Sequence, residues 1–145
     1  MIAALLATLA AGLFAGAALY LTFVEHPARV SCGSMLAVTE FGPSYRRATV
    51  MQVSLAVIGA GAGIARWGTG GGLGWVASAL VLGAVLPFTL LVILSTNHRL
   101  LDPSLDKASP EAAALLARWG RLHAVRSALS LVAFVCFLIL LAKGW

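Results

Sequence analysis

The sequence predicts an all-α integral membrane protein: a bundle of four transmembrane helices with a helical extension before the fourth span. Three observations support this prediction. Of the 145 residues, 61% are hydrophobic and only 10% are charged, whereas a soluble domain carries roughly 25% charged residues. The chain also contains four long runs without a charge, and most ionisable residues lie in two of the connecting segments. We expect a single transmembrane domain over residues 1–145.

Each uncharged run is close to the length that a membrane requires. A helix rises about 1.5 Å per residue, so roughly 20 residues cross a hydrocarbon core of about 30 Å. The last run, residues 127–142, is short and must include part of residues 122–126. We therefore predict spans over about 2–24, 47–66, 73–95 and 120–142. A signal peptide is a less favoured interpretation of the first run, which has no basic segment before it and is too long.

The connections between the spans carry their own signals. The glycine-rich segment 68–72 predicts a turn, and Pro27 is expected to end the first helix. The sequence Ser-Pro-Glu at 109–111 predicts a helix start, because serine caps, proline suits the first position and an acid suits the first turn. This helix should continue into the fourth span, with a bend possible at Gly120. The segments from Glu25 to Tyr45 and from Ser95 to His123 are expected to be loops on one side of the membrane.

Basic residues are distributed unequally between the two sides of the predicted bundle. The side that holds both termini has Arg66 and Lys143. The other side has Arg29, Arg46, Arg47, Arg99, Lys107, Arg118, Arg121 and Arg126, and all five acidic residues. The positive-inside rule makes this second side cytoplasmic, so both termini should lie outside the cytoplasm of a cell-membrane protein. No basic stripe with interleaved aromatic residues indicates nucleic-acid binding.

Polar side chains gather at one level of the bundle, where the spans reach the second side. They are Glu25 and His26 in the first span, Tyr45, Thr49 and Gln52 in the second, Asn97 and His98 in the third, and Trp119, His123 and Arg126 in the fourth. At about 100° per residue, Trp119, His123 and Arg126 fall within an arc of roughly 60°. Lipid cannot satisfy such groups, so they should face inward. The pattern predicts a polar pocket open to the cytoplasmic side.

Each of these residues also has a purely structural interpretation. His123 alone could be a neutral interfacial histidine, Arg126 could extend its charge to lipid phosphates, and the two aromatic residues could belong to interfacial belts. Glu25 could form only a salt bridge, either with Arg29 or with Arg126. A structural interpretation is weakest for Gln52, because a glutamine one to two turns inside a span is costly unless it is paired.

A metal site is a sharper alternative. The three histidines of the chain, His26, His98 and His123, all lie on the second side, with Glu25 adjacent to the first. Three imidazoles and a carboxylate suit zinc, copper or non-haem iron. Haem held between histidines of two helices is a further alternative. No local ligand spacing supports either interpretation.

Four short segments form a distinctive combination. They are Phe23-Val24-Glu25-His26-Pro27-Ala28-Arg29, Tyr45-Arg46-Arg47-Ala48 with Gln52, Asn97 with Leu100, and Trp119-Gly120-Arg121-Leu122-His123-Ala124-Val125-Arg126. Together they resemble the anthrone oxygenase family of small membrane proteins, whose bacterial members are largely of unknown function. The resemblance covers most of the chain and implies a four-helix membrane fold, which we expect in a bacterial inner membrane. From a few fungal and polyketide-pathway relatives, it also implies oxidation of an anthrone to an anthraquinone by dioxygen without a cofactor. It also implies that Glu25, His26, Asn97, Trp119, His123 and Arg126 matter.

Three functional hypotheses follow. The first is a cofactor-independent oxygenase for a lipophilic phenolic or quinol-like substrate, with His123, or Glu25 with His26, as base. Arg126 and Asn97 would then stabilise the anion, and Trp119, Tyr45 and Gln52 would bind the substrate. The second is a metal- or haem-binding redox protein. The third is a non-enzymatic carrier or accessory protein, for which the pairs Gly12/Gly16 and Gly59/Gly63 could form a homo-oligomer.

Overall fold

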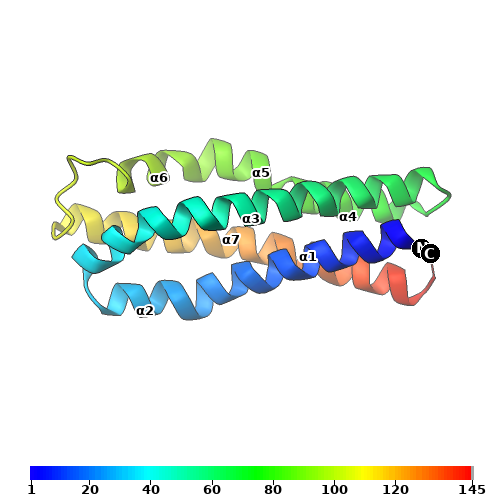
Figure 1. Cartoon of the computed structure of the whole chain (residues 1–145), viewed down its shortest axis with the longest axis horizontal. Coiled ribbons are helices and arrows are strands. Elements are labelled where there is room, and N and C mark those ends of the chain that lie inside the picture. Colours follow the sequence, from blue (N-terminus) through cyan, green and yellow to red (C-terminus); the bar gives the residue numbers. More distant parts are fainter. Residues whose placement is uncertain (145) are drawn as a thin grey trace.

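Four apolar helical segments run side by side along the length of the molecule, and both termini lie at the same end (Figure 1). This computed structural model describes residues 1–144. The first segment comprises α1 (Ile2–Tyr20), the π-helical turn η1 (Leu21–Glu25) and α2 (His26–Ser31), and the second segment is α3 (Ser34–Gly68). The third segment comprises α4 (Leu73–Gly83), α5 (Val85–Phe88), the π-helical turn η2 (Thr89–Ile93) and α6 (Leu94–Leu100). The fourth segment is α7 (Pro110–Ala142). All four are long and apolar enough to cross a membrane. The predicted all-α membrane bundle, with a helical extension before the fourth span, is confirmed.

The helices extend well beyond the predicted spans. With 35 residues in α3 and 33 in α7, each is about 50 Å long, against a hydrocarbon core of about 30 Å. The loop expected from Glu25 to Tyr45 is therefore wrong, because most of it is helix. The loop expected from Ser95 to His123 is likewise too long, because only residues 101–109 lie outside helices. Only a tight turn at Cys32 and Gly33 joins α2 to α3, and Gly33 has a φ of 93°, which suits glycine.

Pro27 does not end the first helix, contrary to the sequence-based expectation. Proline removes one backbone donor and crowds the carbonyl of the preceding turn. Here the chain makes the wider π-helical turn η1 immediately before it, and Pro27 then occupies the first turn of α2, where a missing donor does no harm. Glu25 and His26 consequently stay on one continuous helical segment.

Two hydrophobic clusters divide the bundle along its length. The cluster near the termini is built around the fully buried side chains of Phe14, Trp75 and Phe137. The cluster at the other end includes Phe41 and Trp119 and involves α3, α6 and α7. Between them the polar residues of the site are found.

The outer surface of the bundle is apolar. Leu9, Leu13, Leu80 and Leu91 are each more than half exposed. Large exposed apolar areas are unusual on soluble monomers but suit a surface that contacts lipid. This distribution agrees with four membrane-crossing helices.

The second glycine pair lets helices approach closely within the bundle. A Cβ atom on Gly59 would lie 2.7 Å from Leu82 of α4, and one on Gly63 would lie 2.9 Å from Phe137 of α7. A Cβ atom on Gly16, by contrast, would meet nothing within 4 Å. Gly59 and Gly63 therefore form a seam between helices of the same chain. They are covered within the bundle, so they do not provide the surface predicted for a homo-oligomer.

The start of α7 follows the prediction. The Ser109 hydroxyl accepts a hydrogen bond from the Ala112 amide at 3.2 Å, and Pro110 takes the first helical position. In the loop before it, the Asp102 carboxylate accepts hydrogen bonds from the Ser104 amide and hydroxyl. These bonds, together with that from Arg99, lower the pKa of Asp102 below its usual value. α7 runs through Gly120 as one helix.

Candidate functional site

A cavity of about 290 Å³ lies inside the bundle between the two hydrophobic clusters. Its polar lining consists of Arg29, Ser44, Tyr45, Thr49, Gln52, Thr89, Asn97, Trp119, His123 and Arg126. Apolar side chains such as Phe14, Leu21, Phe41, Val85 and Ile93 complete the wall. The structure thus brings together six of the predicted site residues: Tyr45, Gln52, Asn97, Trp119, His123 and Arg126. The roles assigned to them stay predictions.

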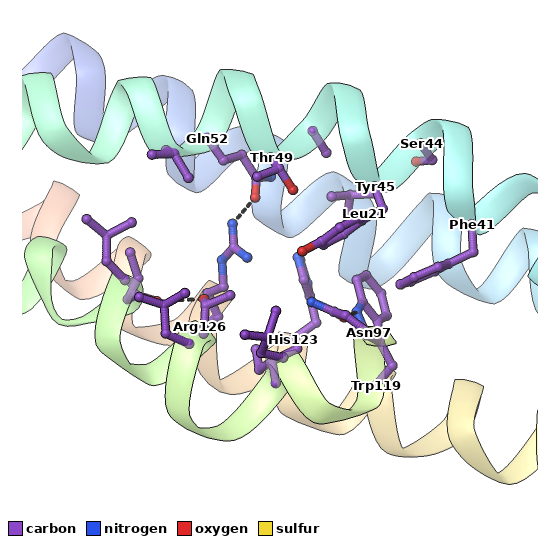
Figure 2. Close-up of a pocket in the computed structure, with 18 of the residues that line it drawn as sticks. Leu21, Phe41, Ser44, Tyr45, Thr49, Gln52, Asn97, Trp119, His123 and Arg126 are labelled. Carbon is purple, nitrogen blue, oxygen red and sulfur yellow. Dashed lines mark hydrogen bonds between the residues drawn. The ribbon is translucent and has the colours of Figure 1, made fainter. Parts of the chain in front are cut away.

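The predicted polar stripes of α3 and α7 face each other across this cavity. Figure 2 shows Tyr45 and Gln52 extending from α3 toward the side where Arg126 and His123 lie. Gln52 and His123 are each 2% exposed, although both lie in membrane-crossing helices. Within each stripe the residues are three or four positions apart, so their side chains follow one another along the same face of the helix and along the cavity wall.

Arg126 is held without a carboxylate partner. Its guanidinium donates a hydrogen bond to Gln52 Oε1 and lies 5.3 Å from the centre of the Phe14 ring. None of the ion pairs among residues 1–144 includes Arg126, and its Nε is buried without a hydrogen-bond partner. A positive charge next to a cavity, with no balancing anion, favours an anionic ligand.

One ring nitrogen of His123 is fixed by hydroxyl groups. Its Nδ1 lies 3.1 Å from Thr22 Oγ1 and 3.4 Å from Ser127 Oγ. The two hydroxyl oxygens also lie 2.7 Å apart, so the hydrogen of one of them lies between them and only the other hydroxyl can donate to the Ala18 carbonyl oxygen, which is 3.0 Å from each. With that second hydroxyl donating to Ala18, no hydroxyl hydrogen points at Nδ1, and the Thr22 oxygen accepts from Nδ1–H.

This arrangement favours the His123 tautomer with its proton on Nδ1. The other nitrogen, Nε2, then carries a free electron pair. No hydrogen bond within the described part of the chain involves Nε2 of His123. A neutral imidazole with a free Nε2 on a cavity wall is a suitable general base.

Trp119 connects the aromatic groups around the site. Its ring stacks on His123, with centroids 4.6 Å apart and planes at 23°, and packs against His26 at 5.0 Å. Phe41 contacts it edge-on at 5.5 Å. Its Nε1 donates to Asn97 Oδ1 at 3.0 Å. These contacts fix both the indole and the Asn97 amide in place.

Glu25 and His26 do not line the cavity. Glu25 accepts from Arg29, whose Nε also lies 3.0 Å from Glu40 Oε2. His26 is buried behind Trp119, over Gly120, where a Cβ atom would lie 2.7 Å from His26 Nε2. The predicted salt bridge between Glu25 and Arg29 is confirmed, and both sequence neighbours support the site from outside.

The three histidines do not converge. His98 is exposed on α6, whereas His26 and His123 are buried on either side of Trp119. Across residues 1–144, no group of three or more His, Cys, Asp or Glu side chains could hold a metal ion. The ligand set considered for a metal therefore does not assemble.

Sequence reasoning missed several residues around the site. Arg29 was expected to mark the cytoplasmic side and to pair with Glu25, yet its buried side chain also lines the cavity. Thr22 and Ser127 hold His123, and Gly120 makes room for His26. A signal existed for Ser127, which lies one helical turn after His123. None existed for Thr22, because its contact spans more than a hundred residues of sequence.

A second, more open groove of about 730 Å³ lies between the first segment and α3. Gly16, Tyr20 and Met51 line its outer part. It shares Leu21, Ser44, Ala48 and Gln52 with the cavity, so these four residues border both spaces.

The fold and site define a membrane-spanning helical bundle that encloses a largely apolar cavity with a histidine and an uncompensated arginine on its wall. The family model for anthrone oxygenase matches residues 41–136, and the chain belongs to that family. The matched segment contains the six cavity-lining residues predicted from sequence and excludes Glu25 and His26. No curated protein and no solved structure matches the chain.

Proposed function

We propose that this protein is a cofactor-independent oxygenase that acts on a lipophilic phenolic or quinol-like substrate bound in the cavity. The observation that carries this proposal is the position of His123, with Nε2 free, beside Arg126, which has no carboxylate partner. A base next to an unbalanced cation suits a reaction that converts a neutral acid into an anion. Membership of the anthrone oxygenase family supports the same chemistry.

The size and the lining of the cavity suit a small aromatic molecule. Its volume of about 290 Å³ is just below the range of roughly 300–1,000 Å³ for small-molecule sites. Phe41 and Tyr45 stack with centroids 5.7 Å apart, and Trp119 stands next to them. We propose that these rings, with the aliphatic wall, hold the fused rings of the substrate.

The first proposed step is a proton transfer. His123 Nε2 removes a proton from an activated C–H of the substrate, such as the methylene of an anthrone. The negative charge spreads onto the carbonyl oxygen, which becomes a phenolate. Arg126 stabilises that oxygen, and Asn97, a second donor on the cavity wall, stabilises the oxygen that dioxygen adds.

The second stage uses dioxygen as the oxidant. The electron-rich anion gives one electron to dioxygen, and the resulting radical and superoxide combine to form a C–O bond. The imidazolium of His123 returns its proton to the peroxide. Loss of the remaining C–H proton with cleavage of the O–O bond releases water and leaves a carbonyl, so one dioxygen converts a methylene into a carbonyl and water. The protein's residues need supply only a base and fixed donors.

We propose that the substrate reaches the cavity from the lipid bilayer. The groove between the first segment and α3 adjoins the cavity, because four residues line both spaces. The end of the bundle rich in arginine, opposite the termini, is proposed to face the cytoplasm of a cell membrane.

The proposal is tested by oxygen consumption with emodin anthrone and purified protein in lipid nanodiscs. We expect the wild type to accelerate uptake above the spontaneous rate, and His123→Gln to lose roughly 10²–10⁴-fold of that acceleration, the usual contribution of a general base. His98→Gln is the matched control, because the same substitution is made at an exposed histidine outside the cavity. Equal rates for wild type, His123→Gln and empty nanodiscs would reject this activity toward emodin anthrone.

A further inference from the structure

Two buried amides on the cavity wall have fixed orientations. The guanidinium of Arg126 can only donate hydrogen bonds, so the atom of Gln52 that faces it must be the oxygen. The indole of Trp119 also can only donate, so the oxygen of Asn97 must face it. In each case a donor-only partner occupies the amide oxygen and leaves the NH₂ group for another contact.

Both amides belong to buried residues, and the NH₂ group of Gln52 is itself buried without a partner. Gln52 is 2% and Asn97 is 1% exposed. Gln52 Nε2 has no hydrogen-bond partner, and neither has the neighbouring Arg126 Nε. A buried donor without an acceptor is unfavourable, so these groups are satisfied only when something in the cavity accepts from them.

The remainder of the wall offers hydroxyl groups, from Ser44, Tyr45, Thr49 and Thr89, but no carboxylate as an acceptor. No Asp or Glu side chain in the described chain lines the cavity. The carboxylates nearest to it, Glu25 and Glu40, are occupied by Arg29. The free Nε2 of His123 is the acceptor that the proposed proton transfer uses.

We infer that the cavity selects planar ligands that present a hydrogen-bond acceptor oxygen at each of two ends. One oxygen is bound by Gln52 Nε2 with Arg126, and the other is bound by Asn97 Nδ2. This inference deepens the proposed function and rests on it for the identity of the site. It names the form that binds best: a carbonyl or deprotonated oxygen at both positions, in preference to a group that itself donates a hydrogen bond.

The consequence for the reaction is a preference for charge after proton transfer. The carbonyl oxygen of a neutral anthrone accepts from Gln52 and Arg126. Once His123 has removed the methylene proton, the same oxygen carries the negative charge and accepts more strongly from both. The donor-rich wall therefore favours the anion over the neutral molecule, which is the differential binding that catalysis requires.

Binding of two inert probes without oxygen tests this inference directly. 9,10-Anthraquinone has a carbonyl oxygen at both ends of its central ring, whereas acridone has the same three-ring shape with an N–H in place of one carbonyl. In nanodiscs, after subtraction of empty nanodiscs, we expect anthraquinone to bind about tenfold more tightly, the effect of one lost hydrogen bond and one unsatisfied donor.

The variant Asn97→Asp replaces only the free NH₂ group by oxygen and keeps an acceptor for Trp119. It should weaken anthraquinone binding about tenfold and narrow or reverse the preference, because the new oxygen can accept from the acridone N–H. Thr96→Val is the matched control, because it removes a buried hydroxyl next in sequence that has no partner and does not line the cavity. It should leave the preference unchanged.

Equal binding of the two probes by the wild type would overturn the inference. So would an equal loss for both probes in Asn97→Asp, which would indicate a merely structural role. Oxygen uptake distinguishes this failure from that of the proposed function. If the wild type prefers anthraquinone but consumes no oxygen, the inferred ligand recognition stands and the proposed oxygenase activity is rejected. If it consumes oxygen but binds both probes equally, the oxygenase activity stands and the inferred recognition is rejected.

Discussion

Replacing Arg126 by methionine should remove activity while leaving stability nearly unchanged. Burial of its charge costs several kcal/mol in free energy. Against this stand the hydrogen bond to Gln52, about 1.5–3 kcal/mol, and the contact with the Phe14 ring, about 2 kcal/mol. These terms nearly cancel, so we expect Arg126→Met to change the free energy of unfolding by less than about 1 kcal/mol.

Arg29→Met provides the comparison, because that arginine is paired. Breaking a fully buried pair costs about 3–5 kcal/mol. The side chains of Glu25 and Glu40 are 31% and 41% exposed and recover water, so a loss of about 1.5–3 kcal/mol is expected. Arg29 should therefore matter more for stability than Arg126.

Both quantities can be measured on the same preparations. Unfolding by SDS titration gives the stability, and oxygen uptake with emodin anthrone gives the rate. Loss of charge stabilisation should lower the rate of Arg126→Met about 10²–10³-fold. A loss of more than about 3 kcal/mol in Arg126→Met, equal to or above that of Arg29→Met, would refute the reasoning and give Arg126 a structural role.

Three further predictions concern packing and positioning around the site. Gly120→Ala should cost about 1–3 kcal/mol by SDS titration, because its Cβ would lie 2.7 Å from the packed ring of His26; an unchanged midpoint would show that the ring has room to move. Gly59→Ala should cost a similar amount, whereas Gly16→Ala, with nothing within 4 Å, should be neutral or stabilising; equal effects would contradict an internal glycine seam. Thr22→Val, which removes the hydroxyl near the base, should slow substrate deprotonation about tenfold with the fold retained; an unchanged rate would mean that the hydroxyl does not set the tautomer.

The sequence predicted the architecture well, because a segment inside a membrane must be apolar and nearly free of charge. Such a segment is visible in the local sequence without knowledge of its contacts. Uncharged runs gave four spans, and the Ser109 cap gave the start of α7. Helix lengths were underestimated, since apolar length measures only the part inside the membrane. Pro27 was misjudged because its effect depends on whether the preceding turn can widen, as it does in η1.

The candidate site could be predicted in part for a similar reason. Helical spacing identified Gln52 and His123 as inward-facing, because a polar side chain within a span needs hydrogen-bonding partners that lipid does not supply. The direction of Glu25 could not be predicted, since it depends on where Arg29 and Glu40 meet after α2 and α3 have turned back on each other. Contacts between distant segments, such as that of Thr22 with His123, can be identified only once the packing of the helices is known.

The central claim is that His123 removes a proton from a substrate held within the helical bundle. Anaerobic exchange tests it without the oxygen steps: emodin anthrone is incubated in deuterated buffer with protein in nanodiscs, and deuterium incorporation at its methylene carbon is followed by mass spectrometry. We predict exchange roughly 10²-fold faster with wild type than with His123→Gln. Exchange at the same rate with wild type, His123→Gln and empty nanodiscs would contradict the claim.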